Sequence, residues 1–158
     1  MIARDDDAAD VRVPPPLVYV AAAVAGVLLH LFVYPLELPF PLPVCVAGTI
    51  ITGIAGALLL MAALVAFLRT GQNPKPWKTT PEFIGTGPYR WSRNPMYAGM
   101  ALVLIALAFA LTNGWLLAFV PVVLAIVYRT AIRHEEAYLD EKFGDSYRAY
   151  KRSVRRWL

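Results

Sequence analysis

The chain has 158 residues with a net charge of +4, and 58% of its residues are hydrophobic while only 16% are charged. A soluble domain usually carries about 25% charged residues, and here the hydrophobic excess lies in long uncharged runs, so the composition excludes a soluble globular enzyme. The single cysteine, Cys45, cannot form an internal disulfide or a cysteine-rich metal site. We therefore expect an all-α integral membrane protein with four transmembrane helices, no bound metal and no separate nucleotide-binding domain.

The first half of the chain contains two predicted spans. Residues 1–14 are expected to form a flexible cytoplasmic N-terminus, and one membrane domain follows over 15–158. Spans are predicted at about 16–36 and 44–68, since roughly 18 or more apolar residues are needed to cross a bilayer. Small residues recur every four positions in the second span and predict close helix packing; they are Gly48, Thr52 and Gly56.

A long connection over residues 69–95 follows the second span. Its five prolines and three glycines discourage a continuous helix. Its large apolar side chains indicate that part of it docks on the protein; they are Phe83, Ile84, Tyr89, Trp91 and Tyr97. Pro95 suits the first turn of a helix, which places Arg93 and Asn94 at the positive end of the helix dipole.

The next apolar stretch is too long for one helix and is predicted to be a hairpin. Residues 94–128 carry no charge, and a turn at 112–114 divides them into spans at about 95–111 and 115–132. All 15 lysines and arginines fall before the first span, between the second and third, or after the fourth. By the positive-inside rule, these segments and both termini face the cytoplasm, as expected in an inner or cytoplasmic membrane.

The C-terminal tail, 133–158, is predicted to be an amphipathic interfacial helix. Apolar residues recur at helical spacing almost to the end of the chain and predict one apolar helix face; they are Leu139, Phe143, Tyr147, Tyr150, Val154 and Trp157. Gly144 is expected to interrupt it and Asp145 to cap a new helix. The basic face is expected to contact anionic lipid rather than nucleic acid; it comprises Arg148, Lys151, Arg152, Arg155 and Arg156. Glu136 can pair with Arg133 on the surface, or Glu135 and Glu136 can belong to a site.

Two motifs carry a resemblance to a known family. The segment 87–97, GPYRWSRNPMY, resembles the G-x-Y-x-x-x-R-H-P-x-Y signature of the isoprenylcysteine carboxyl methyltransferases. After a two-span hairpin, the segment 135–150 is similar to that family's E-E-x-x-L, F-G-x-x-Y-x-x-Y pattern. The resemblance covers about residues 66–157. It departs at Asn94, where the signature often has histidine; asparagine keeps a donor and an acceptor but cannot take up a proton.

The resemblance implies a membrane methyltransferase that uses S-adenosylmethionine and releases S-adenosylhomocysteine. Carried over by residue, the cofactor site would comprise Gly87, Tyr89, Arg93, Asn94, Pro95, Tyr97, Glu135 and Glu136. We expect Arg93, Arg133 and Glu135 to be the catalytic residues. The lipidic acceptor is expected to contact Arg129, Arg133, Met96 and Met100, and no oligomer is indicated.

The resemblance implies that the acceptor is the carboxylate of an isoprenylcysteine-like substrate, which would make the protein a carboxyl O-methyltransferase; methylation of a phospholipid amine or a small thiol is the alternative. A prenylcysteine carboxylate is already ionised and needs a cation to hold it, whereas a phospholipid amine or a small thiol needs a base, for which Glu135 is the nearest group. A four-span transporter would depend on an ionisable residue inside the membrane, and only His30 lies well within a span. A nicotinamide-dependent membrane reductase and a catalytically inactive scaffold also stay open.

Overall fold

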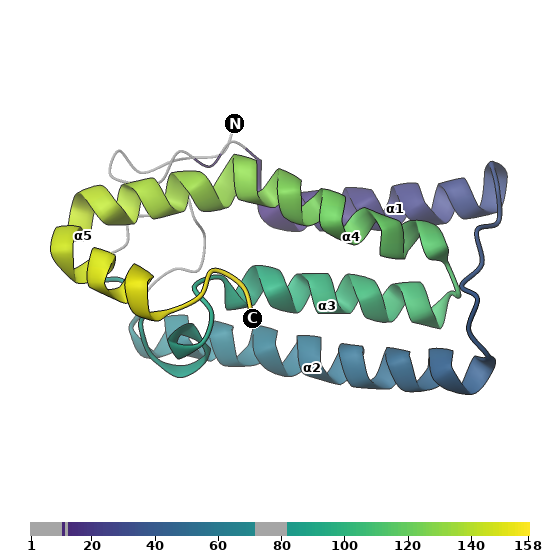
Figure 1. The fold of residues 1–158 in the computed structure, drawn as a ribbon, viewed down its shortest axis with the longest axis horizontal. Coiled ribbons are helices and arrows are strands. Elements are labelled where there is room, and N and C mark those ends of the chain that lie inside the picture. The colour runs from purple at the N-terminus through teal and green to yellow at the C-terminus, as the bar shows by residue number, and fades with distance from the viewer. Residues whose placement is uncertain (1–10, 12, 72–81) are drawn as a thin grey trace.

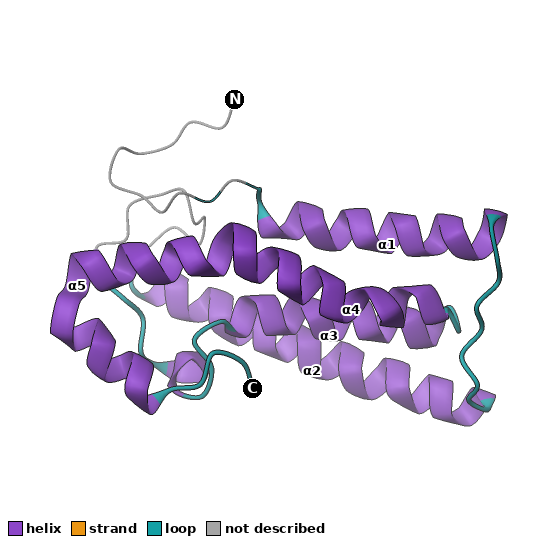
Figure 2. Cartoon of the chain, turned by 45° about the horizontal axis from the view of Figure 1, so that its top comes forward, coloured by secondary structure: helices purple, strands orange, loops and turns teal. Residues whose placement is uncertain are grey.

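A computed structural model describes residue 11 and residues 13–71 and 82–158, and these fold into a bundle of helices (Figures 1 and 2). The predicted N-terminal segment 1–14 therefore lies almost wholly outside the described residues, as does the middle of the 69–95 connection. The elements, in chain order, are α1 (Pro15–Phe32), α2 (Leu42–Arg69), the 3₁₀ turn η1 (Gly87–Arg90), α3 (Pro95–Ala110), α4 (Gly114–Val127), the π-helical turn η2 (Tyr128–Ile132) and α5 (Arg133–Ser153).

The four predicted spans correspond to α1 to α4, with shifted ends. Among the described helices, three runs are long and apolar enough to cross a membrane, namely α1, α2 and the continuous run that begins with α4. The fourth, α3, has 16 residues and is shorter than that requirement. The first span ends at Phe32 rather than at 36, and the fourth changes from α-helix to π-helix at Tyr128.

The helix pairs pack through small residues. A methyl group placed on Gly56 of α2 would lie 2.9 Å from the carbonyl oxygen of Gly99 on α3, so the two backbones are almost in contact there. Gly26 of α1 similarly leaves room for Leu116 of α4, which is fully buried. The prediction that small residues in the second span mediate close packing is confirmed.

The hairpin turn is confirmed at residues 112–114. The Asn113 side chain accepts hydrogen bonds from the backbone N–H groups of Trp115 and Leu116, and so caps the first turn of α4. Its amide also donates to the Gly26 carbonyl at 3.0 Å. The 36–38 segment pairs with this turn through Leu38 N–H to the Thr112 carbonyl and Gly114 N–H to the Leu36 carbonyl. Both predicted outer connections therefore lie at one end of the bundle.

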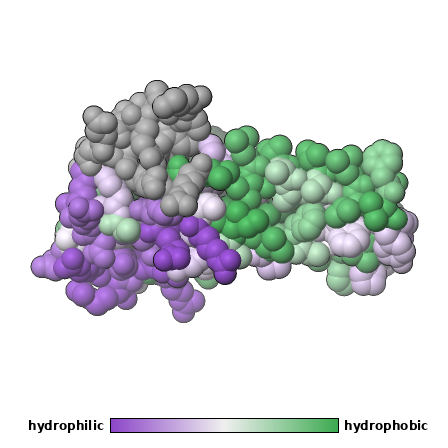
Figure 3. All heavy atoms as spheres, turned by 90° about the horizontal axis from the view of Figure 1, so that it is seen from above, coloured by the Kyte–Doolittle hydropathy of each residue, from purple (hydrophilic) through white to green (hydrophobic). Residues whose placement is uncertain are grey.

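The polar segments gather at the other end. In Figure 3 the hydrophobic residues cover the bundle, whereas hydrophilic residues collect at the end where α5 lies in Figure 1. The predicted break at Gly144 is confirmed, because its φ of 54° lies in the left-handed region and reverses the direction of α5. No described contact shows Asp145 as a helix cap, so that role stays a prediction.

The tail departs from the prediction after Ser153. Helix α5 ends there, and Val154 is extended, with a φ of −120° and a ψ of 134°. The following residues lie beside the start of α3, where Arg155 forms an isolated parallel bridge with Ser92. The prediction that the helical stripe continues to Trp157 is therefore wrong: Trp157 instead packs against the bundle core. We call residues 154–157 the C-terminal strap.

Candidate functional site

The start of α3, the start of α5 and the C-terminal strap meet at the polar end of the bundle. Pro95 occupies the first position of α3 and is buried, so the preceding Arg93 and Asn94 are held at the helix N-terminus as predicted. The π-helical turn η2 directly precedes α5, which carries Glu135 and Glu136 in its first turn. Turns of this kind inside helices are frequent at functional sites.

Tyr97 and Glu135 form the first contact between the two motifs. The Tyr97 hydroxyl donates to Glu135 Oε1 at 2.5 Å, across 38 residues of sequence. Tyr19 of α1 fixes the same region, since its hydroxyl donates to the Tyr97 carbonyl at 2.8 Å. The predicted meeting of the two motifs at one end of the bundle is therefore seen in the structure.

An ion-pair cluster lies beside this contact. Glu136 Oε1 is 3.1 Å from Arg93 Nη2, and both side chains are about nine-tenths buried. Arg156 donates to both oxygens of Glu136, from Nε and from Nη2, at 3.0 Å each. The Arg156 guanidinium also lies 4.9 Å from the centre of the Tyr128 ring. We call Arg93, Glu136 and Arg156 the arginine–carboxylate cluster.

Backbone contacts join the C-terminal strap to the start of α3. The Arg93 N–H donates to the Arg155 carbonyl at 2.8 Å, and Arg93 Nη1 donates to the Lys151 carbonyl at 2.9 Å. The Arg156 carbonyl accepts from Asn94 Nδ2 at 3.0 Å and from Ser92 Oγ at 3.3 Å. Asn94 thus uses its donor to hold the strap, a role for which a proton-accepting group is not needed.

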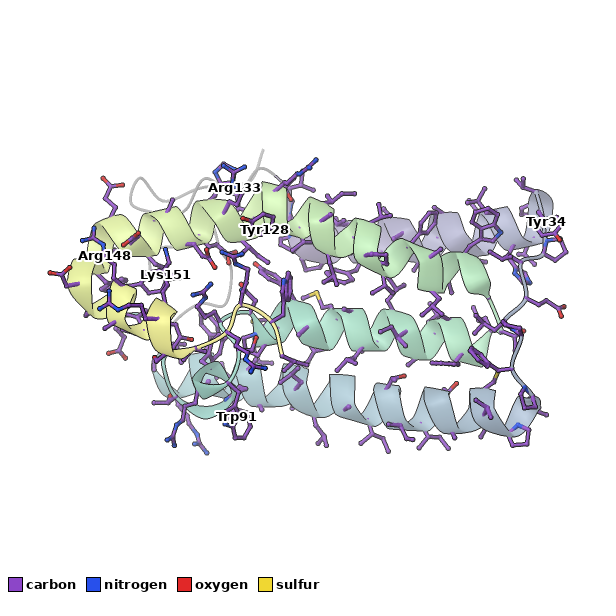
Figure 4. The ribbon with its side chains drawn as sticks, in the orientation of Figure 1. Tyr34, Trp91, Tyr128, Arg133, Arg148 and Lys151 are labelled. Carbon is purple, nitrogen blue, oxygen red and sulfur yellow. The ribbon has the colours of Figure 1, made fainter. Side chains whose placement is uncertain are left out.

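An aromatic layer covers the same end. Phe83 contacts the rings of Phe143, Tyr147 and Tyr150 of α5, and the Tyr150 hydroxyl donates to the Tyr89 carbonyl at 2.7 Å. Burial raises the pKa of Tyr150 to about 12, so this hydroxyl stays a donor at neutral pH. The predicted docking of the connection is confirmed for Phe83, Ile84 and Tyr89. Trp91 is 74% exposed and points outward (Figure 4).

The two neighbouring carboxylates differ in their electrostatic surroundings. Burial raises the pKa of Glu135 to about 7; the hydrogen bond from Tyr97 opposes this rise, and the charge of Glu136 adds to it. Glu136 faces two guanidinium groups, whereas no described cation pairs with Glu135. Glu135 is therefore the carboxylate that can exchange a proton near neutral pH.

Arg93 keeps one unused donor. Its Nε is buried and has no hydrogen-bond partner among the described residues, although the two terminal nitrogens of the same side chain are both engaged. A buried donor without a partner is costly, commonly by about 1–3 kcal/mol. An anionic ligand group, such as the carboxylate of S-adenosylmethionine, would satisfy it, and Glu135 could face the cationic part of the same ligand. The residues present therefore fit that cofactor.

The other predicted site residues are distributed around the cluster. Tyr89 is buried against Phe67 of α2, and Gly87 has a φ of 59°, which glycine tolerates. Met96 and Met100 are half-buried; Met96 packs beside Tyr89 and Met100 against the bundle core. These positions lie on the first two turns of α3 or just before it.

Arg129 and Arg133 are not brought into the cluster. Both are exposed, and Figure 4 shows Arg133 on the side of the α4–α5 run that faces away from α2 and α3. The predicted pairing of Glu136 with Arg133 is wrong, because Glu136 turns toward Arg93 and Arg156 instead. The expected roles of Arg129 and Arg133 in acceptor binding and catalysis stay predictions.

His30 does not offer a membrane-centre site. It lies in the last turn of α1, toward the outer connection, and its Nδ1 has no partner in the part of the chain that the structure describes.

Sequence reasoning misses the C-terminal strap and its arginine. The helical period, extended beyond Ser153, places Arg156 on a lipid-facing basic surface. The one local indication to the contrary is weak: serine and valine at 153 and 154 are poorer helix formers than the lysine and arginine before them. Ser92, fully buried between Asn94 and the strap, has no sequence indication of its role.

Comparison with known proteins identifies the family. Residues 44–146, well over half of the chain, match the phospholipid methyltransferase family. A relative from Haemophilus influenzae, named only as an uncharacterized protein, is 41% identical over 63 residues, which are 40% of this chain and the whole of the relative. No solved structure gives a significant match. The matched region includes all but the first two residues of α2, the whole of α3 and α4, and both halves of the site up to Glu136. The chain belongs to the phospholipid methyltransferase family, a family of membrane methyltransferases.

Proposed function

We propose that this protein transfers a methyl group from S-adenosylmethionine to an acceptor that partitions into the cytoplasmic leaflet. The observation that carries the proposal is the buried Nε of Arg93, which lacks a partner among the described residues, beside the Tyr97–Glu135 pair in a chain of a membrane methyltransferase family. An unpaired cationic donor on Arg93 and the carboxylate of Glu135, which neighbours the Glu136 that Arg93 contacts, suit a ligand that carries both signs of charge. S-adenosylmethionine has a carboxylate, an ammonium and a sulfonium.

Each residue of the site then has a distinct task. When bound, S-adenosylmethionine supplies an electrophilic methyl group. Arg93 would hold the cofactor carboxylate through Nε, and Glu136 keeps the Arg93 guanidinium in place. Tyr97 fixes one oxygen of Glu135 and leaves the other oxygen for the ligands. Methyl transfer is a direct displacement, so alignment of the reactants can supply roughly 7–11 kcal/mol of the barrier reduction.

The geometry favours an amine headgroup as the acceptor. An amine is protonated at neutral pH and must lose a proton before its nitrogen can take the methyl group. Glu135, whose pKa burial raises to about 7, could accept that proton first. The freed lone pair on nitrogen would then form the N–C bond as the methyl–sulfur bond breaks, and the electron pair of that bond would leave with the sulfur of S-adenosylhomocysteine. The family's description, phospholipid methyltransferase, points to the same class of acceptor.

A prenylcysteine carboxylate is the second candidate, supported by the two motifs that resemble the isoprenylcysteine carboxyl methyltransferases. Such an acceptor needs a cation but no base. The cations expected to hold it, Arg129 and Arg133, are exposed away from the cluster. A small thiol would need Glu135, as an amine does.

We also propose a four-span topology with both termini in the cytoplasm. Helix α3 is short, but it packs along α2 and is joined to α4 by a three-residue turn that pairs with the α1–α2 connection. The described basic residues at the ends of α2 and α4 lie at the opposite end of the bundle from that turn, where the positive-inside rule predicts the cytoplasm.

Two measurements test the cofactor and the acceptor separately. Calorimetric titration of the full chain in lipid nanodiscs should give heat with S-adenosylhomocysteine and none with NADPH; the reverse would favour a reductase, and heat with neither would contradict the proposal. Isotopically labelled cofactor is then supplied with phosphatidylethanolamine, a prenylcysteine and a thiol in parallel. Label in the phospholipid amine supports the favoured acceptor, and label in the prenylcysteine alone supports the second.

A further inference from the structure

An apolar groove between α1 and α4 is separate from the methyl-transfer site. It has a volume of about 490 Å³ and is lined by apolar residues. The α1 side comprises Val13, Leu17, Val18, Ala21, Ala22 and Ala25, and the α4 side Phe119, Val122, Val123 and Ile126. Figure 2 shows the two helices side by side.

The length of the groove matches one leaflet. It runs along α1 from Leu17 to Ala25, which is roughly 12 Å at 1.5 Å per residue, and extends to Val13 just before the helix. Half of a typical hydrocarbon core is about 15 Å thick. The groove begins at the end of the bundle that we propose to be cytoplasmic, so an acyl chain of a cytoplasmic-leaflet lipid would fill it from its headgroup end inward.

Two arginines continue the α4 side of the groove. Arg129 follows three residues after Ile126, the last residue that lines the groove, and Arg133 lies four residues further, just after the π-helical turn η2. Both arginines are exposed, and no described carboxylate lies within ion-pair distance of either one. They differ in this from Arg93, Arg148 and Arg156, each of which pairs with a carboxylate.

We propose that this groove and the two arginines bind an anionic phospholipid. The acyl chain lies between α1 and α4, and the phosphate contacts Arg129 and Arg133 at the groove's cytoplasmic end. Guanidinium groups bind phosphate through paired, charge-assisted hydrogen bonds. A basic residue near an anionic membrane surface is attracted to it by about 1 kcal/mol, and the groove adds an apolar surface that fixes where the lipid sits. This lipid is a bound partner rather than the methyl acceptor, since the residues that line the groove include neither a member of the arginine–carboxylate cluster nor Tyr97 or Glu135.

Native mass spectrometry of the full chain with an equimolar mixture of phosphatidylglycerol and phosphatidylcholine tests the proposal without any activity measurement. The wild type should retain phosphatidylglycerol preferentially. The double variant Arg129→Gln/Arg133→Gln should lower that preference by about fivefold per arginine, or about 25-fold in total. The control Arg69→Gln/Arg152→Gln removes the same charge from two other exposed positions and should change it less than about twofold.

A separate variant tests whether the groove between α1 and α4 binds the acyl chain. Ala21→Phe fills the groove and should reduce retention of phosphatidylglycerol, whereas Ala57→Phe, on an exposed face of α2, should not. Arg129→Lys/Arg133→Lys keeps the charge and should preserve most of the preference, which separates lipid binding from a folding defect. Equal retention of both lipids by the wild type, equal loss in both double glutamine variants, or a lipid-free dimer that Ala21→Phe dissociates would each overturn the proposal.

Discussion

The apolar bundle and its polar end are stabilised in different ways. In the bundle, the helices are held by close packing: Gly56 and Gly99 allow α2 and α3 to approach, and Leu116 packs against Gly26. At the polar end, contact depends on pairing: Arg93 and Arg156 share the carboxylate of Glu136. Lipid tails are as apolar as the helices, so the bundle gains its specificity from close packing. The polar end gains its specificity from charge and hydrogen bonds.

This difference assigns stability mainly to the apolar bundle and chemistry to its polar end. A site that handles a charged cofactor needs groups whose protonation and position are set by neighbours, and such neighbours are available only where the chain leaves the apolar bundle. The bundle in turn fixes the start of α3 through Tyr19, whose hydroxyl bonds to the Tyr97 carbonyl. The two regions can be perturbed independently, and variants at each should show distinct effects.

The largest effect is expected for Glu136→Ala. The change leaves the guanidinium groups of Arg93 and Arg156 side by side without their shared carboxylate. Removing one partner of a buried ion pair typically costs about 3–5 kcal/mol, and we expect about 3 kcal/mol here because Arg156 is partly exposed. Thermal unfolding in detergent should show a large drop in Tm, and binding of S-adenosylhomocysteine should weaken with it.

The matched control is Asp140→Asn on the surface of α5. Asp140 pairs with Arg148 and Lys151, but these groups are open to solvent, so the loss of stability should be much smaller than for Glu136→Ala. Equal effects of the two substitutions would contradict the distinction between a buried and a surface pair.

Glu135 is expected to make the folding stability depend on pH, with a maximum effect similar to that of Glu136→Ala. Its pKa is 4.5 in an unfolded chain and about 7 in the folded protein, so the folded state binds more protons between these values. Folding stability should therefore fall as the pH rises from about 4.5 to 7 and then level off. A shift of this size corresponds to at most about 3 kcal/mol.

Glu135→Gln removes this titrating group, so the pH dependence of the variant can be compared directly with that of the wild type. The difference in Tm between the variant and the wild type should grow in favour of the variant from pH 5 to pH 8. If the same carboxylate accepts the acceptor's proton, activity of the wild type should rise through an apparent pKa near 7 and Glu135→Gln should abolish that rise. Parallel Tm curves would show that Glu135 is not desolvated.

In the bundle, Gly56→Ala should cost about 2 kcal/mol. The added methyl group would lie 2.9 Å from the Gly99 carbonyl oxygen and 3.1 Å from Leu102 Cβ, and overpacking of this kind typically costs about 1–3 kcal/mol. Gly53→Ala, one turn earlier on α2, meets only Ala106 Cβ at 3.6 Å and should be nearly neutral. A similar Tm for both variants would mean that α2 and α3 can separate without loss. Cofactor affinity should change less than it does for Glu136→Ala.

The bundle was largely predictable from sequence, and so was the meeting of the two motifs. Apolar run lengths located α1 to α4, and local turn chemistry at Asn113 located the hairpin, because both depend on neighbouring residues. The contact between Tyr97 and Glu135 followed from placing two motifs at the same end of one hairpin. These predictions needed no knowledge of how distant side chains orient.

The partners within the site were not predictable in the same way. The choice of Arg156 over Arg133 as the partner of Glu136 depends on where α5 ends and how the chain then returns to Ser92. That return is fixed by backbone hydrogen bonds across about sixty residues, which leave no periodic pattern in the sequence. The three-residue spacing along the helix favoured Arg133 as the partner of Glu136.

The smallest effect is expected for Ser92→Ala, which tests the C-terminal strap. The Ser92 hydroxyl donates to the Arg156 carbonyl and accepts from the Asn94 N–H, and the side chain is fully buried. Loss of one such buried hydrogen-bonding group should cost about 1 kcal/mol, whereas Ser146→Ala, at an exposed position of α5, should be close to neutral. Because the Arg93 N–H donates to the Arg155 carbonyl of the strap, hydrogen exchange of the Arg93 amide should accelerate in Ser92→Ala and not in Ser146→Ala. Unchanged exchange would mean that the backbone bond from Arg93 to Arg155 holds the strap by itself, and that the polar end depends on fewer contacts than the structure indicates.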